Sequence, residues 1–212
     1  MSIDPVRIQV RELAALVRDL RTLPEEDWRR PTLCTGWDVE DVVAHLGAAS
    51  RLSMIGWIRS MVGARFDADL HNRRRLEEFR GPDPATTLAR FADAGPIALP
   101  RRASIAGLGE VLVHAEDIRR PLGLHHSPDH AGLLAVADFF ARRDFAVNSR
   151  TLVRGLRLEA TDAEFEHGPG DGAGTVRGPL LSLVLAMAGR RAVLEDLSGS
   201  GVAPLLARIS AG

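Results

Sequence analysis

Apolar side chains recur every three to four residues along most of the first 150 residues, which predicts amphipathic helices on a shared core. Turn residues and prolines separate five such stretches. Their approximate ranges are 4–22, 38–61, 84–95, 104–120 and 128–147. By contrast, the segment 63–84 has no clear apolar stripe and carries many charges. We therefore expect it to be a solvated connection.

The pattern changes near residue 150. Residues 156–160 alternate between apolar and polar side chains, as a half-buried strand does. The glycine-rich segment 164–177 can hold two short strands, and an apolar helix follows over 178–187, with two short helices after it. The sequence therefore predicts a mainly α protein with a helical bundle over residues 1–150 and a small α+β domain over residues 151–212.

The stretch 110–120 carries the candidate chemistry. Glu110 and His114 are four residues apart, so they lie one above the other on one face of the predicted helix. A carboxylate and an imidazole in this arrangement can bind the same divalent metal ion. Two ligands hold a metal weakly, and His45 on the second predicted helix is our candidate for a third. The alternative is a surface pair of Glu110 with His114 and an ordinary core histidine at position 45.

Composition and charge exclude several classes of protein. The chain has 212 residues, of which 45% are hydrophobic and 26% charged, as is usual for a globular protein. A net charge of -1 offers no basic surface for nucleic acid or for an anionic membrane. No apolar run reaches the ~20 residues of a membrane span, and the polar N-terminus does not resemble a signal peptide. Cys34 is the single cysteine, which excludes an internal disulfide and favours a cytoplasmic protein.

Two segments of the chain resemble the mycothiol-dependent maleylpyruvate isomerase family. Residues 33–46, LCTGWDVEDVVAHL, resemble its loop-and-helix signature, and residues 110–123, EVLVHAEDIRRPLG, resemble its second signature. Residues 155–162, 178–179 and 188–190 are similar to the small C-terminal domain that many members carry. This resemblance implies a DinB-like metal-binding four-helix bundle followed by a small α+β domain.

The resemblance also implies functional residues and cofactors. Family members hold a divalent metal, usually zinc, and the matching ligands in this chain are His45, Glu110 and His114. Mycothiol, a low-molecular-weight thiol, is the implied second cofactor. An arginine of the C-terminal domain assists catalysis in the isomerase, and Arg190 is the best match to it.

Three protein ligands with one open position are typical of a catalytic zinc site. We therefore expect an enzyme, an isomerase or S-transferase that uses the thiol on a small electrophilic substrate such as maleylpyruvate, as a monomer or a homodimer. The alternative is a metal-binding helical bundle without catalysis, acting as a sensor or interaction protein.

Other polar residues have a functional and a plainer interpretation. Asp41 could orient His45, and Asp117 could orient His114, although solvated helix charges are commoner. Cys34 has no basic neighbour in the sequence, which is typical of a small buried residue. Four arginines could bind a substrate carboxylate or be surface charges, and three clustered histidines could bind a metal or be exposed. These residues are Arg101, Arg102, Arg119 and Arg190, and His125, His126 and His130.

Overall fold

The computed structural model of the protein describes residues 3–52, 54–65, 67–100, 103–145, 147–169 and 174–211. Contacts divide the chain into two compact units, Met1–Ser127 and Pro128–Gly212. The first unit is helical and the second combines helices with a three-stranded sheet, which confirms the predicted fold class. No helix in the described ranges is long and apolar enough to cross a membrane.

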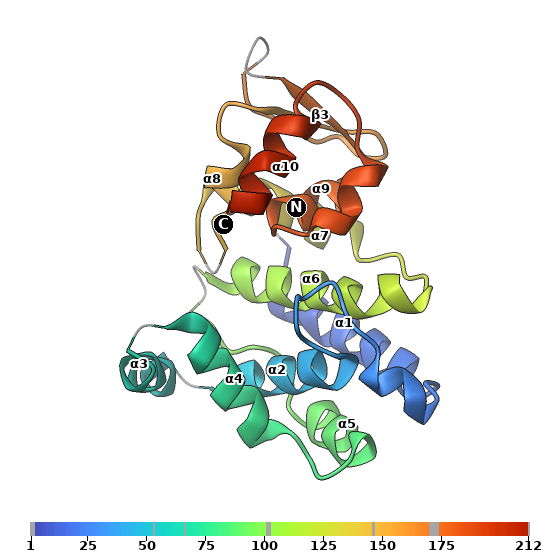
Figure 1. Cartoon of the computed structure of the whole chain (residues 1–212), viewed down its shortest axis with the longest axis vertical. Coiled ribbons are helices and arrows are strands. Elements are labelled where there is room, and N and C mark those ends of the chain that lie inside the picture. Colours follow the sequence, from blue (N-terminus) through green and yellow to red (C-terminus); the bar gives the residue numbers. More distant parts are fainter. Residues whose placement is uncertain are drawn as a thin grey trace. The chain divides into compact units, whose positions relative to one another are not determined.

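Helices α1 (Pro5–Leu20), α2 (Val39–Arg51) and α6 (Ser104–Leu122) carry most of the core of the first unit. Figure 1 shows α1 and α6 side by side, and α2 packs against α6 as well. The remaining elements of this unit are η1 (Glu25–Arg29), α3 (Met54–Gly63), α4 (Ala68–Phe79) and α5 (Pro84–Ala92). Both α4 and α5 pack on α2. Helix α2 is therefore held between α6 and the pair formed by α4 and α5.

The predicted helix over 38–61 is interrupted, and the predicted connection over 63–84 is wrong. Leu52 ends α2 with an extended backbone, so the chain turns before α3 begins. Helix α4 forms within the charged segment because Leu76 and Phe79 are buried in the core of the unit. Gly47 of α2 lies against the Phe79 ring, where a side chain would have no space.

The second unit begins with α7 (His130–Arg142), which packs on α9 (Leu180–Met187) and α8 (Ser149–Val153). The sequence pattern predicts a domain boundary at residue 150, whereas the compact units divide before α7. The difference arises because α7 packs on α9, which follows residue 150 in the sequence. The residues of α7 that are buried include Leu133, Val136, Ala137 and Phe140.

The sheet of the second unit has the order β2-β1-β3. Strand β1 (Arg157–Ala160) pairs antiparallel with β2 (Glu166–His167) and parallel with β3 (Thr175–Gly178). The strands on either side of the glycine-rich turn therefore each pair with β1. Helix α9 packs on β1 and β3, and η3 (Arg191–Asp196) and α10 (Val202–Ala211) complete the unit.

Candidate metal centre

Helix α6 carries polar side chains at Glu110, His114 and Asp117, although most of its surface is buried. The Glu110 Oε1 atom lies 3.3 Å from the His114 Nε2 atom, as the four-residue spacing predicts. His114 and Asp117 are both buried, and Glu110 is partly exposed. One rigid helix thus provides two of the three predicted ligands.

His45 of α2 lies at the same place. Its Nε2 atom is 2.8 Å from the Glu110 Oε1 atom, and its ring centroid is 4.9 Å from that of His114. One ligand atom from each of His45, Glu110 and His114 lies within 4.8 Å of the other two. The structure therefore brings together three side chains that are separated by up to 69 residues in the sequence.

The electrostatics of this group are dominated by burial and by mutual contacts. Burial alone would raise the pKa of Glu110, but the charge of His114 and the hydrogen bonds from His114 and His45 hold this pKa well below its usual range. Burial alone would lower the pKa of His114, but the Glu110 charge and the hydrogen bonds with Asp117, Cys34 and Glu110 raise it well above 6.5. Glu110 and His114 thus each stabilise the charged form of the other, across the 3.3 Å between Glu110 Oε1 and His114 Nε2.

A second group of potential ligands lies on the other side of the His114 ring. The Asp117 Oδ2 atom is 2.9 Å from His114 Nδ1 and accepts a hydrogen bond from the Cys34 thiol at 3.0 Å. Cys34 Sγ lies 3.5 Å from His114 Nδ1. Asp117 has no solvent exposure, so its interpretation as a solvated helix charge is wrong. This role of Cys34 was not predicted from the sequence, because 80 residues separate it from His114.

Trp37 lies beside both imidazole rings. Its ring centroid is 4.9 Å from that of His45 and 6.4 Å from that of His114. These contacts of Trp37 with the two histidines were not predicted from the sequence. This indole ring forms one side of the candidate centre.

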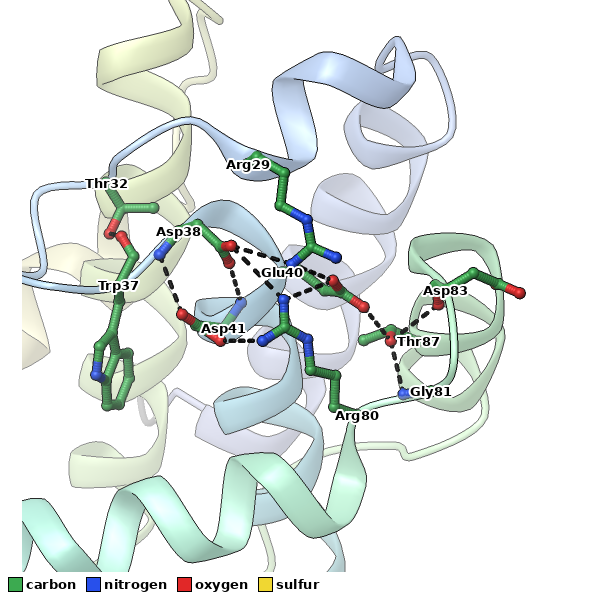
Figure 2. A network of polar contacts seen from close by, with 10 residues as sticks. All are labelled: Arg29, Thr32, Trp37, Asp38, Glu40, Asp41, Arg80, Gly81, Asp83 and Thr87. Carbon is green, nitrogen blue, oxygen red and sulfur yellow. Dashed lines mark hydrogen bonds and ion pairs between the residues drawn. The ribbon is translucent and has the colours of Figure 1, made fainter.

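A polar network fixes the start of α2, the helix that carries His45 (Figure 2). The buried Glu40 carboxylate accepts hydrogen bonds from Arg80 Nη2 at 2.8 Å and Thr87 Oγ1 at 2.7 Å. Arg29 Nη1 lies 2.9 Å from the same carboxylate. Asp41, which we considered as a residue that orients His45, accepts from Arg80 Nη1 at 2.8 Å and from the Asp38 backbone. The network therefore joins the first turn of α2 to η1, α4 and α5.

The other candidates lie elsewhere. Arg119 is buried and its Nε atom donates to Asp19 Oδ2 at 2.8 Å, so it joins α6 to α1. His126 pairs with Glu12 at 2.7 Å, and the described residues show no metal cluster formed with His125 and His130.

Two further expectations concern arginines. Arg190 belongs to the second unit, where its Nη1 atom donates to the Ala188 carbonyl at 2.8 Å. Arg101 and Arg102 lie outside the described residues.

Comparison with known proteins identifies one family and one fold. Residues 7–104 match the family model described as "Mycothiol maleylpyruvate isomerase N-terminal domain". The crystal structure of the mycothiol-dependent maleylpyruvate isomerase is 16% identical, with a TM-score of 0.63 over 92% of this chain and 91% of that chain. A histidine-to-alanine mutant of that isomerase is 15% identical, with a TM-score of 0.62 and the same coverage. At this identity the likeness shows a shared fold. None of the curated protein sequences compared with the chain is significantly similar to it.

Proposed function

Because residues 7–104 belong to the mycothiol maleylpyruvate isomerase N-terminal domain family, we propose that this protein is a metal-dependent enzyme that uses a low-molecular-weight thiol. The thiol is mycothiol, and the reaction is isomerisation of, or transfer to, a small electrophilic substrate such as maleylpyruvate. The observation that carries this proposal is the convergence of His45, Glu110 and His114 from two helices.

The donor set fits zinc. Two imidazole nitrogens and one carboxylate oxygen are the ligands of many catalytic zinc sites, which keep a fourth position for a small molecule. Zinc bonds of about 2.0–2.2 Å require ligand atoms roughly 3–3.5 Å apart. The separations of 2.8 Å between His45 and Glu110 and 3.3 Å between His114 and Glu110 need only small adjustments. These three residues would therefore hold the ion.

When bound, zinc supplies a positive charge that favours the thiolate form of a thiol, which is the nucleophilic form. In an isomerisation, the thiol adds to a cis double bond, the resulting single bond rotates, and the thiol leaves. In a transfer, the thiol attacks an electrophilic carbon and stays bonded to the product. Trp37, next to His45 and His114, would limit the access of water on one side.

Arg190 is the proposed catalytic arginine, on the strength of the sequence resemblance. A guanidinium group is suited to bind a substrate carboxylate through two parallel hydrogen bonds. We expect Arg190→Ala to lower kcat/KM for a carboxylate-bearing substrate by at least tenfold. Arg191→Ala is the matched control, because Arg191 is the exposed neighbour of Arg190 in the sequence. Equal activities of the two variants would exclude Arg190 from catalysis.

The proposed function is tested with purified protein, first metal-free and then loaded with zinc. We expect one zinc ion per chain by elemental analysis, and consumption of mycothiol or isomerisation when maleylpyruvate or another small electrophile is added. His45→Ala and His114→Ala should lose both the metal and the activity while the far-ultraviolet circular dichroism stays unchanged.

Two results would contradict the proposal. Zinc binding without any reaction across a broad panel of electrophiles and thiols would favour the alternative, a non-catalytic metal-binding module. A metal-free protein that takes up no divalent ion at equilibrium would reject both functions.

A further inference from the structure

Asp117 and Cys34 form a hydrogen-bonded pair behind His114, on the side of the imidazole away from Glu110. Asp117 lies one turn after His114 on α6 and is fully buried. Its Oδ2 atom is 2.9 Å from His114 Nδ1 and 3.0 Å from Cys34 Sγ. Since a carboxylate only accepts hydrogen bonds, both the imidazole Nδ1–H and the thiol donate to the same oxygen.

This arrangement determines which ring nitrogen of His114 is free to bind a metal. A proton held at Nδ1 leaves the lone pair of the neutral ring at Nε2. The Nε2 atom is the one that lies 3.3 Å from Glu110, in the group that His45 completes. Carboxylates that accept from the second nitrogen of a ligating histidine commonly raise metal affinity by fixing its tautomer and orientation.

The thiol of Cys34 reaches Asp117 because the loop before α2 is attached to α6. The Leu33 amide donates to the Asp117 carbonyl at 3.1 Å, and the Cys34 amide donates to Thr32 Oγ1 at 3.1 Å. The Trp37 amide donates to the Cys34 carbonyl at 3.0 Å, which closes the turn. The loop thus holds the thiol against the carboxylate, and the carboxylate has a second donor that limits its rotation.

We propose that Asp117 and Cys34 are positioning residues, which hold the His114 imidazole with Nδ1 protonated and Nε2 directed toward His45 and Glu110. Asp117 fixes the ring directly, and Cys34 acts through Asp117. This inference rests on the proposed function for its effect on metal binding, whereas its effect on the tautomer is independent of any metal.

The first experiment compares the zinc affinities of variants by competition with a chelator. Asp117→Ala should weaken zinc binding by about 10- to 100-fold. Asp117→Asn keeps a hydrogen-bond acceptor without charge, so its zinc affinity should lie between those of Asp117→Ala and the unaltered protein. Cys34→Ala should weaken binding severalfold, and Cys34→Ser, which keeps a donor, should restore most of the loss. Asp27→Asn is a matched control in the same unit, since its carboxylate pairs with Arg30 near the surface. Wild-type affinity in both Asp117→Ala and Cys34→Ala would overturn the proposal.

The second experiment observes the tautomer directly, by nitrogen-15 NMR of the metal-free protein at a pH where His114 is neutral. The unaltered protein should show a protonated Nδ1, and Asp117→Ala should shift the ring toward the other tautomer. A protein that binds no zinc but shows this shift would retain the positioning role and refute the proposed function. A tautomer unchanged by Asp117→Ala would refute the positioning role whatever the metal affinity. A third result would also overturn the inference: if Cys34→Ser no longer binds zinc but Asp117→Ala still binds one ion per chain, the thiol is a direct ligand.

Discussion

Replacement of Arg80 by alanine should destabilise the first unit far more than the loss of an ordinary surface charge. The guanidinium group contacts the Glu40 and Asp41 carboxylates at 2.8 Å each and approaches Asp38 at 3.6 Å. The Glu40 side chain is 1% exposed, so removal of Arg80 leaves a buried carboxylate with less charge compensation. Asp38 and Glu40 would then keep their ion pairs with Arg29, and Asp41 would lose its 2.8 Å contact with Arg80.

The magnitude follows from this burial. Breaking a buried ion pair by removing one partner costs about 3–5 kcal/mol, because the other charge is left uncompensated. Arg80 is 27% exposed, and Arg29 still contacts Glu40 at 2.9 Å. We therefore expect a loss at or just below the lower end of this range, about 2–3 kcal/mol of the free energy of unfolding. The measurement is urea denaturation followed by the fluorescence of Trp28 and Trp37, which both belong to this unit.

The control is Arg75→Ala in α4, the helix that Arg80 directly follows. Arg75 pairs with Glu78, whose side chain is 59% exposed, so its loss should cost about 0–1 kcal/mol. In a Glu40→Gln background the buried charge is absent, and Arg80→Ala should cost at least about 1 kcal/mol less than in the unaltered protein. Equal losses for Arg80→Ala and Arg75→Ala, or strict additivity with Glu40→Gln, would refute the reasoning.

Three further outcomes are expected. Zinc affinity should fall as the pH decreases from about 8 to 6, by about tenfold per pH unit for each proton displaced. The reason is that the pKa of His114 is raised, so zinc must displace its proton. Titration with a chelator that reports free zinc checks this, and an affinity that does not change with pH contradicts it. In the metal-free protein, the lowered pKa of Glu110 stabilises the fold until the pH falls below 4.5. The raised pKa of His114 stabilises the fold at low pH, and this contribution is lost as the pH rises above 6.5. The melting temperature should therefore decline below pH 4.5 and above pH 6.5, and a melting temperature that climbs steadily above pH 6.5 would contradict this. Gly47→Ala should cost about 1–3 kcal/mol of the free energy of unfolding, because its Cβ would overlap the Phe79 ring. Gly63→Ala meets no atom within 4 Å and should be neutral. Thermal denaturation of both variants checks this difference.

Much of the fold could be predicted from periodicity, and the exceptions have physical causes. The apolar stripe of α6 was predicted correctly. Leu108, Val111 and Leu112 are regularly spaced in the sequence, and all three are fully buried in the structure. Helix α4 was missed because its buried face consists of few apolar residues, such as Leu76 and Phe79, within a run of charges. A short amphipathic helix of this kind is stabilised by tertiary packing, which cannot be predicted from a short stretch of sequence.

The candidate centre was partly predictable for a related reason. Glu110 and His114 share one helix, so their proximity follows from helical geometry alone. His45 was a candidate from the sequence, and the resemblance to a family supported it, because the approach of α2 to α6 is a tertiary contact that spacing along the chain does not give. The position of Cys34 depends on a loop and on the hydrogen bond between Leu33 and Asp117, which no periodicity indicates.

One uninterrupted helix carries residues 110, 114 and 117, and this constrains how the protein can evolve. Insertion of a single residue between Glu110 and His114 would rotate everything beyond it by about 100° and carry the imidazole away from its carboxylate neighbour. Point substitutions in the apolar stripe can be absorbed by repacking, whereas a change of length in this segment cannot. We therefore expect natural variation here to exchange side chains at constant length, with insertions and deletions confined to the connecting loops.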